Sequence, residues 1–169
     1  MIFNRFAAEA RGCVGAALDE ARRLGHDAIG DEDLLLGILR ADEGHAAEAL
    51  SSLGVTLEAA REECEGMFSD ALSSIGISLE EIRREAGDAF EMRIPDDRRI
   101  PFSPQAKRVL GQSLTEAVRL RDNRIGTEHI LLGMLHDEDR TSVRLLARMG
   151  VSPEALEARL FESRGRAAG

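Results

Sequence analysis

The chain has 169 residues, of which 43% are hydrophobic and 31% charged, and it contains neither tryptophan nor tyrosine. Its formal net charge of −9 argues against nucleic-acid binding, which requires a clustered basic surface. No apolar run approaches the roughly 20 residues that a membrane-spanning helix needs, and the N-terminus lacks the apolar core of a signal peptide. We therefore expect a soluble, cytoplasmic protein with no nucleic-acid and no membrane partner.

The elements predicted from the N-terminus onward are helices. The first helix has one apolar face, because six residues recur at steps of three and four: Phe6, Ala10, Val14, Ala17, Ala21 and Leu24. Asp31 stands where an N-cap oxygen is needed before the next apolar run. Gly54 is expected to end the third helix in the left-handed C′ conformation, and Thr56 to cap the fourth. Since no convincing strand pattern occurs, the chain is predicted to be all-α.

A repeat with a period of 96 residues relates the two halves of the chain. The stretch IGDEDLLLGIL, which begins at Ile29, recurs as IGTEHILLGML from Ile125, where Thr127 takes the predicted N-cap position. The match continues without a gap, with 20 identities over the 54 positions of residues 6–59. A repeat of this length indicates duplicated structural units. We therefore predict two copies of one four-helix unit, at residues 1–66 and 102–163.

A shorter repeat, with an offset of 22, lies inside the first unit. The stretch ALSSLGVTLEAAREE from Ala49 recurs as ALSSIGISLEEIRRE from Ala71, and removing this duplication would shorten the long period to 96 − 22 = 74. We predict an inserted, duplicated helix pair at residues 67–90. A proline-containing linker at 91–101 and a disordered tail at 164–169 are also expected. Because the insertion carries apolar side chains that need burial, one outlet for them is a homodimer.

The paired motif resembles a known family. The IG-[DT]-E-x-[IL]-LLG stretches, each preceded by F-x-x-x-A-[RK] and followed by L-x-x-[LM]-G-V, are similar to the double repeat in the N-terminal domain of Clp/Hsp100 ATPases of the ClpC type. The resemblance covers about residues 3–161 apart from the duplicated segment, and it implies a pseudo-twofold helical module that receives adaptors and marked substrates for a Clp ATPase. No G-x-x-x-x-G-K-[ST] loop occurs. We expect a free-standing, non-catalytic binding module.

The resemblance also implies a phosphoarginine-type site in each repeat. Three residues of the second repeat match the family pattern: Ser103, Glu128 and His129. A carboxylate in a first helical turn can pair with a guanidinium while helix-end N–H groups bind phosphoryl oxygens, although it can equally well only complement the helix dipole. The first repeat keeps Glu32 but has Ala7 and Asp33 in place of the hydroxyl and the histidine. We predict one working pocket, in the second repeat, and a weaker site at Glu32.

A second surface follows from the same resemblance. Residues at the openings of the two units match positions where cyclic peptide antibiotics bind actinobacterial relatives: Phe3, Arg11, Phe102 and Lys107. The alternative is that Phe102 belongs to the core and that Arg11 and Lys107 are simply solvated. Three functions therefore remain open: a module that binds adaptors or marked substrates or competes for them, a decoy for cyclic peptides, and a structural dimerising partner of a Clp ATPase.

Cysteine and histidine show no spacing typical of a redox or metal site. Cys13 and Cys64 lie on predicted helices and are expected to be buried, reduced thiols. The four histidines form no zinc or catalytic signature: His26, His45, His129 and His136. We therefore predict no enzyme activity, no cofactor and no metal.

Overall fold

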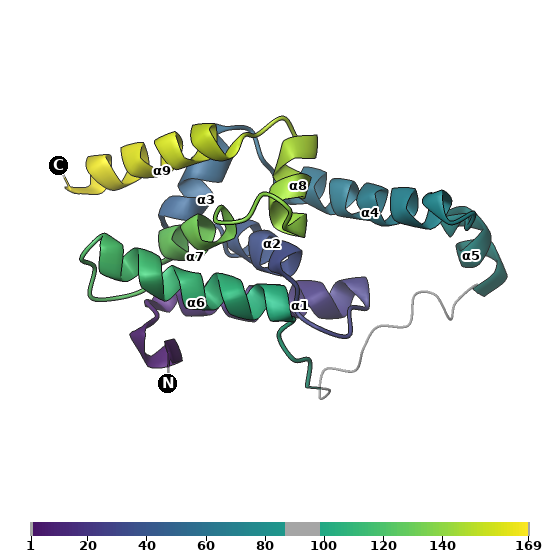
Figure 1. The fold of residues 1–169 in the computed structure, drawn as a ribbon, viewed down its shortest axis with the longest axis horizontal. Helices are drawn as coiled ribbons and strands as arrows, with labels where there is room; N and C mark the ends of the chain where they lie inside the picture. Colours follow the sequence, from purple (N-terminus) through teal and green to yellow (C-terminus); the bar gives the residue numbers. More distant parts are fainter. Residues whose placement is uncertain (1, 87–98, 169) are drawn as a thin grey trace.

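The structure is a computed structural model that describes residues 2–86 and 99–168. Within these residues the regular elements are a short 3₁₀ helix and nine α-helices, so the predicted all-α fold is confirmed. The first unit contains α1 (Ala8–Leu24), α2 (Asp31–Ala41), α3 (Gly44–Ser52) and α4 (Leu57–Ser74), followed by α5 (Leu79–Ala86). The second contains α6 (Pro104–Arg119), α7 (Thr127–Met134), α8 (Thr141–Arg148) and α9 (Pro153–Ala168). The helices α1–α4 thus correspond to α6–α9 (Figure 1).

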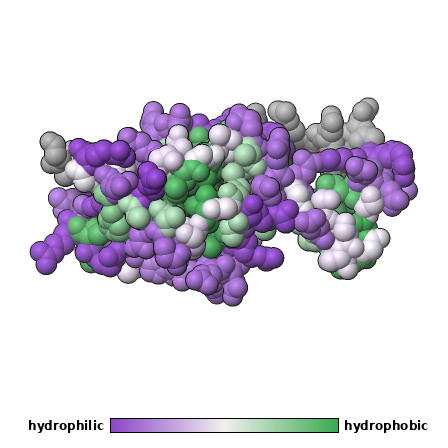
Figure 2. Space-filling view, turned by 90° about the horizontal axis from the view of Figure 1, so that it is seen from above, coloured by the Kyte–Doolittle hydropathy of each residue, from purple (hydrophilic) through white to green (hydrophobic). Residues whose placement is uncertain are grey.

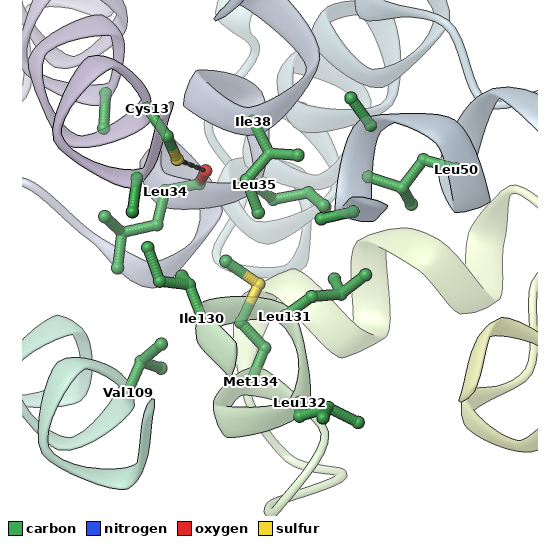
Figure 3. Close-up of a cluster of buried hydrophobic side chains, with 14 of the residues drawn as sticks. Cys13, Leu34, Leu35, Ile38, Leu50, Val109, Ile130, Leu131, Leu132 and Met134 are labelled. Atoms are coloured by element: carbon green, nitrogen blue, oxygen red, sulfur yellow. Dashed lines mark hydrogen bonds between the residues drawn. The ribbon is translucent and has the colours of Figure 1, made fainter. Parts of the chain in front are cut away.

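The core lies where α2 and α7 meet, and both helices are lined by buried leucine and isoleucine. Leu35, Ile38, Leu131 and Met134 are completely buried (Figure 3). Each such side chain stabilises the fold by roughly 1.5–3 kcal/mol. Since α2 packs on α1, α3, α4, α6, α7 and α8, the two units share a single core rather than two separate ones.

Short backbone pairings also join the units. Ala7 N–H donates to the Ile125 carbonyl over 2.9 Å, and Ser103 N–H donates to the Ile29 carbonyl over 2.9 Å. In each case the segment that opens one unit pairs with the segment that precedes the second helix of the other unit. The start of α2 therefore lies beside the opening of the second unit, and the start of α7 beside the opening of the first.

The prediction that Asp31 and Thr127 cap their own helices is wrong. The N-cap residues are Gly30 and Gly126, and Asp31 and Thr127 are the first residues of α2 and α7. Their side chains instead cap helices of the opposite unit: Asp31 Oδ2 accepts from Ser142 N at 2.8 Å in α8, and Thr127 Oγ1 accepts from the third residue of α3 at 3.3 Å. These positions therefore stabilise the interface between the units.

The inserted segment differs from the predicted helix pair. The boundary expected at residue 66 falls inside α4, which continues unbroken to Ser74, and the rest of the described insertion is α5. Together they project from the body, and hydrophobic residues gather on the far end (Figures 1 and 2). Phe68, Ile75 and Ile77 are 54%, 70% and 39% exposed. Residues 87–90 of the predicted insertion and most of the predicted linker 91–101 lie outside the described residues.

The predicted disordered tail at 164–169 is also wrong, because α9 continues to Ala168. Tertiary contacts hold this last stretch: the Ser163 hydroxyl is buried against His45 at 2.9 Å, and Arg164 pairs with carboxylates of the second unit. The polar composition of the segment therefore reflects a packed, ion-paired helix end. Among the helices described, none combines the length and the apolar character needed to cross a membrane.

Candidate functional site

Two equivalent clusters of charged side chains lie at the starts of α2 and α7: His26, Glu32 and Asp33, which we call the first pocket, and Asp122, Glu128 and His129, which we call the second. In each, a glutamate at the second helical position folds back over the N-cap glycine: Glu32 over Gly30, and Glu128 over Gly126. A Cβ atom on either glycine would meet that carboxylate, which would have to move aside. The Glu32 and Glu128 side chains are 21% and 11% exposed, so the carboxylates are mostly withdrawn from water.

Each pocket also contains a histidine–aspartate pair, but the two residues exchange places. In the first pocket His26 Nδ1 lies 2.8 Å from Asp33 Oδ2, and in the second His129 Nε2 lies 2.8 Å from Asp122 Oδ2. The 96-residue offset relates His26 to Asp122 and Asp33 to His129. The first repeat therefore keeps the histidine, supplied by the preceding loop rather than by the helix. In the alignment of the two repeats, histidine and aspartate change places at both positions. This reciprocal exchange is the sequence feature that could have identified the pair.

The second pocket contains the guanidinium of Arg164, a residue that was expected from the sequence to lie in a disordered tail. Arg164 Nη1 of α9 lies 2.8 Å from Asp122 Oδ2 and 3.1 Å from Glu128 Oε1. Although burial raises the pKa of Asp122, hydrogen bonds from Arg164 and His129 hold it below its ordinary value. The second pocket is therefore a cation site whose cation belongs to the chain itself. No spacing rule links Arg164 to Glu128, because only the packing of α9 brings them together.

The first pocket has a different charge balance. Its first turn carries three carboxylates in succession, Asp31, Glu32 and Asp33. The last two face His26, whereas Asp31 caps α8. Burial, with the neighbouring charges of Asp33 and Asp31, raises the pKa of Glu32 to about 7. The hydrogen bond with Asp33 raises the pKa of His26. This pocket therefore concentrates negative charge that is only partly neutralised by histidine.

Cys64 of α4 lies close enough to the first pocket to sense its charge. Burial raises the pKa of its thiol to about 12, and the charge of Glu32 adds to the effect. The pKa of Cys13, which is completely buried in α1, is also raised by burial to about 12. Both cysteines are free, and both thiols stay protonated at neutral pH, which makes them unreactive.

Ser103 does not sit where the repeat numbering suggests. Its hydroxyl caps α6 by accepting from Ala106 N at 3.1 Å, and its backbone pairs with Ile29, directly before the N-cap of α2. The structure therefore places Ser103 at the side of the first pocket and Ala7 at the side of the second. This differs from the predicted grouping of Ser103 with Glu128 and His129, because each pocket combines the opening of one unit with the helix start of the other.

The predicted peptide surface is partly assembled. Phe3 stacks on Phe102 with ring centroids 6.0 Å apart, and both rings are half-buried, whereas Arg11 and Lys107 are exposed on α1 and α6. The Phe3 ring also packs edge-on against Phe6, at 5.2 Å, which is completely buried. Phe6 is therefore a core residue, and the stacked pair lies at the boundary between core and surface.

Comparison with known proteins agrees with this architecture. The model of the Clp repeat (R) N-terminal domain matches residues 5–70, 62–149 and 101–167. The chain is 35% identical over 164 residues to a chloroplastic ClpA homolog, an ATP-binding subunit of the ATP-dependent Clp protease from Brassica napus, and to chloroplastic chaperone protein ClpC1 from Arabidopsis thaliana. Both alignments cover 97% of this chain but only 16% and 15% of those proteins.

Solved structures share the fold. The N-terminal domain of the Arabidopsis thaliana chaperone ClpD has a TM-score of 0.70 at 24% identity, with 95% of this chain and 98% of that chain covered. The Hsp104 N-terminal domain from Candida albicans has a TM-score of 0.64 at 16% identity, with 95% and 91% covered. The repeated helix-start motif, the shared core of the two units and these matches lead to one conclusion: the chain belongs to the Clp repeat N-terminal domain family.

Proposed function

We propose that this chain is a non-catalytic protein-binding module of a Clp protease system, which receives adaptors or arginine-marked clients or competes for them. One observation carries the proposal: the Asp122 and Glu128 carboxylates hold the guanidinium of Arg164 at the start of α7. A carboxylate pair that already binds one guanidinium has the charge to bind another. The chain spans about a sixth of the length of the curated relatives that it matches.

The chemistry of the second pocket suits a phosphoarginine side chain. Glu128 and Asp122 supply anions for the guanidinium. The N–H groups of Thr127 and Glu128, at the first two positions of α7, have no acceptor one turn earlier in the helix and suit the phosphoryl oxygens. His129 is buried and orients Asp122. In this scheme Arg164 occupies the place of the incoming guanidinium, and a ligand binds by displacing it.

Calorimetric titration with free phosphoarginine tests the proposal. Since Arg164→Ala removes the internal competitor, we expect it to bind at least about ten-fold more tightly than the unaltered chain, while Glu128→Ala abolishes binding. Arg159→Ala is the matched control, because Arg159 also lies on α9 but pairs with Glu162. Equal affinity in all four proteins, or binding that survives Glu128→Ala, would contradict the proposal.

A role as a decoy for cyclic peptides is a second candidate, favoured by the stacked pair of Phe3 and Phe102 at the openings of the two units, where α1 and α6 each carry an exposed cation. A half-buried aromatic pair offers a flat apolar platform, and Arg11 and Lys107 offer donors to peptide carbonyls. Titration of an apolar cyclic peptide should then give binding that Phe102→Ala weakens and Glu128→Ala leaves unchanged. Binding unaffected by Phe102→Ala would rule out this surface.

The exposed apolar end of α4 and α5 favours self-association, which was the outlet expected from the sequence for the apolar side chains of the insertion. Phe68 and Ile75 would be covered if two chains packed these segments together. Analytical ultracentrifugation of the unaltered chain should then show a dimer that Ile75→Lys converts to monomers. A monomer at all concentrations would exclude this arrangement.

A further inference from the structure

The two carboxylates of the first pocket face a single nitrogen atom. His26 Nδ1 lies 2.8 Å from Asp33 Oδ2 and 3.8 Å from Glu32 Oε1, and one potential ligand atom from each residue lies within 4.8 Å of the others. Two ligands of a tetrahedral Zn²⁺ ion, each at about 2.0–2.2 Å from the metal, are about 3.3–3.6 Å apart. The two distances from Nδ1 bracket this spacing, so small side-chain movements suffice for coordination.

A buried oxygen in this cluster has no partner among the described residues. Asp33 is completely buried, and its Oδ2 accepts from Gly30 N at 2.9 Å, but its Oδ1 makes no hydrogen bond. Both oxygens share one carbon, so Oδ1 lies next to the oxygen that faces His26. A buried carboxylate oxygen without a hydrogen-bond partner is unfavourable, and coordination of a cation by this carboxylate would satisfy it.

In the second pocket, the equivalent histidine and carboxylates already form hydrogen bonds and ion pairs within the chain. Gly126 N–H donates to His129 Nδ1 over 2.8 Å, so Nε2 carries the proton that faces Asp122. Neither nitrogen of His129 has a free lone pair, and the guanidinium of Arg164 contacts both carboxylates. In the first pocket Asp33 takes over the hydrogen bond from the N-cap glycine, which leaves His26 Nδ1 facing both carboxylates.

We propose that His26, Glu32 and Asp33 bind a divalent transition-metal ion, with Zn²⁺ as the best fit. One imidazole nitrogen and two carboxylate oxygens form a donor set that suits Zn²⁺ better than Mg²⁺ or Ca²⁺, which prefer oxygen ligands alone. The Gly30 N–H bond to Asp33 would orient the ligand from outside. His26 is 33% exposed, so the ion has access from solvent and a fourth position stays open.

This inference is independent of the arginine pocket and changes the role of the other one. A metal ion on Glu32 would exclude a guanidinium there, so the weaker site predicted in the first repeat would bind a metal rather than a marked arginine. Sequence spacing does not suggest the site, because a histidine six residues before a Glu-Asp pair matches no metal motif. The pocket exists only because the loop before α2 folds back on the helix start.

Titration of the full chain with Zn²⁺, after removal of metals by a chelator, tests the site. We expect one ion per chain, a higher melting temperature on binding, and at least ten-fold weaker binding to Glu32→Gln and to His26→Asn. Glu128→Gln, in the equivalent cluster, is the matched control and should bind Zn²⁺ like the unaltered chain. His45→Asn controls for ions held by a histidine near Glu48.

Two results would overturn the proposal. One is the absence of stoichiometric Zn²⁺ binding, and the other is binding that Glu32→Gln and His26→Asn leave intact. Circular dichroism of both variants without metal establishes that they are folded. Glu32→Gln keeps the shape of the side chain, so it still decides the question if His26→Asn fails to fold. The phosphoarginine titration uses Glu128 and Arg164, and its failure would leave the metal result unaffected.

Discussion

The starts of α2 and α7 carry the same sequence motif and the same backbone, yet their electrostatics differ. The second pocket contains an internal cation, because Arg164 lies against Asp122 and Glu128. In the first, two carboxylates face one histidine, and burial raises the pKa of Glu32 to about 7. The motif therefore sets the geometry of a helix start, while residues outside the motif decide which charge the pocket accepts.

The difference originates in the last helix of each unit. At the 96-residue offset, Arg164 of α9 corresponds to Phe68 of α4, which is 54% exposed. Arginine at this helical position reaches the pocket in one unit, whereas phenylalanine in the other contributes no charge. The two units thus differ at this helical position as well as in the exchange of histidine and aspartate, and substitutions at this position test how far it controls the pockets.

The largest effect should come from removing the internal cation. Arg164→Ala leaves the Asp122 and Glu128 carboxylates together without their guanidinium, and we expect the free energy of unfolding to fall by about 2–3 kcal/mol. The value lies below that of a fully enclosed pair, because the Arg164 side chain is 23% exposed. Urea denaturation measures it. Phe68→Ala, at the equivalent position, should change the free energy of unfolding by less than about 0.5 kcal/mol. If both variants lost the same stability, Arg164 would not distinguish the second pocket from the first.

Glu32→Gln should have the opposite sign and depend on pH. Since the folded-state pKa of about 7 lies above the ordinary 4.5, the folded protein holds this proton more tightly than the unfolded chain. The stability of the unaltered protein therefore falls as pH rises from about 4.5 to 7, and glutamine removes that penalty. At pH 8, with a chelator present, the variant should be more stable by on the order of 2 kcal/mol, and at pH 4 by almost nothing. A gain that is the same at both pH values would contradict the assignment.

Phe68→Arg should make the first pocket resemble the second. A guanidinium at this position would neutralise Glu32, lower its pKa and stabilise the fold at pH 8 by about 1 kcal/mol. The measurement is the pH dependence of denaturation together with a Zn²⁺ titration, because the same arginine should displace the metal. Phe68→Lys adds the same charge without a guanidinium. If Phe68→Arg weakens Zn²⁺ binding and Phe68→Lys does not, the effect comes from pairing of the guanidinium with Glu32 and not from positive charge alone.

The smallest change in stability is expected for the double variant His26→Asp with Asp33→His. It gives the first pocket the order found in the second, where the helical histidine accepts from the N-cap glycine. Because the number of hydrogen bonds and the charge stay the same, stability should change by less than about 1 kcal/mol. Zn²⁺ binding should nevertheless be lost. The nitrogen that faces the aspartate could not pass its proton to the other ring nitrogen, because that nitrogen would accept from the N-cap glycine. If this variant kept full Zn²⁺ affinity, the order of histidine and aspartate would not explain why only the first pocket binds the metal.

The fold follows from the sequence for a local reason. Apolar residues at helical spacing in residues 6–24, glycines at helix ends such as Gly54, and a gap-free 96-residue repeat are all properties of neighbouring residues, and the structure confirms the all-α fold that they predict. Capping was less predictable, since Asp31 and Thr127 are suitable N-caps by type. Their oxygens instead bind helix ends in the other unit, which no local pattern contains.

The sequence by itself determined two helical units, a buried apolar face on each, and a glutamate at the start of α2 and of α7. Only the tertiary structure decided which openings flank which helix starts, that α9 continues through Arg164, and that His26 lies against Glu32 and Asp33. The physical reason is the sequence distance over which each kind of interaction acts. Helix periodicity and capping act over a few residues, whereas the charge balance of each pocket is the sum of groups that only the packing of distant segments brings within a few ångströms.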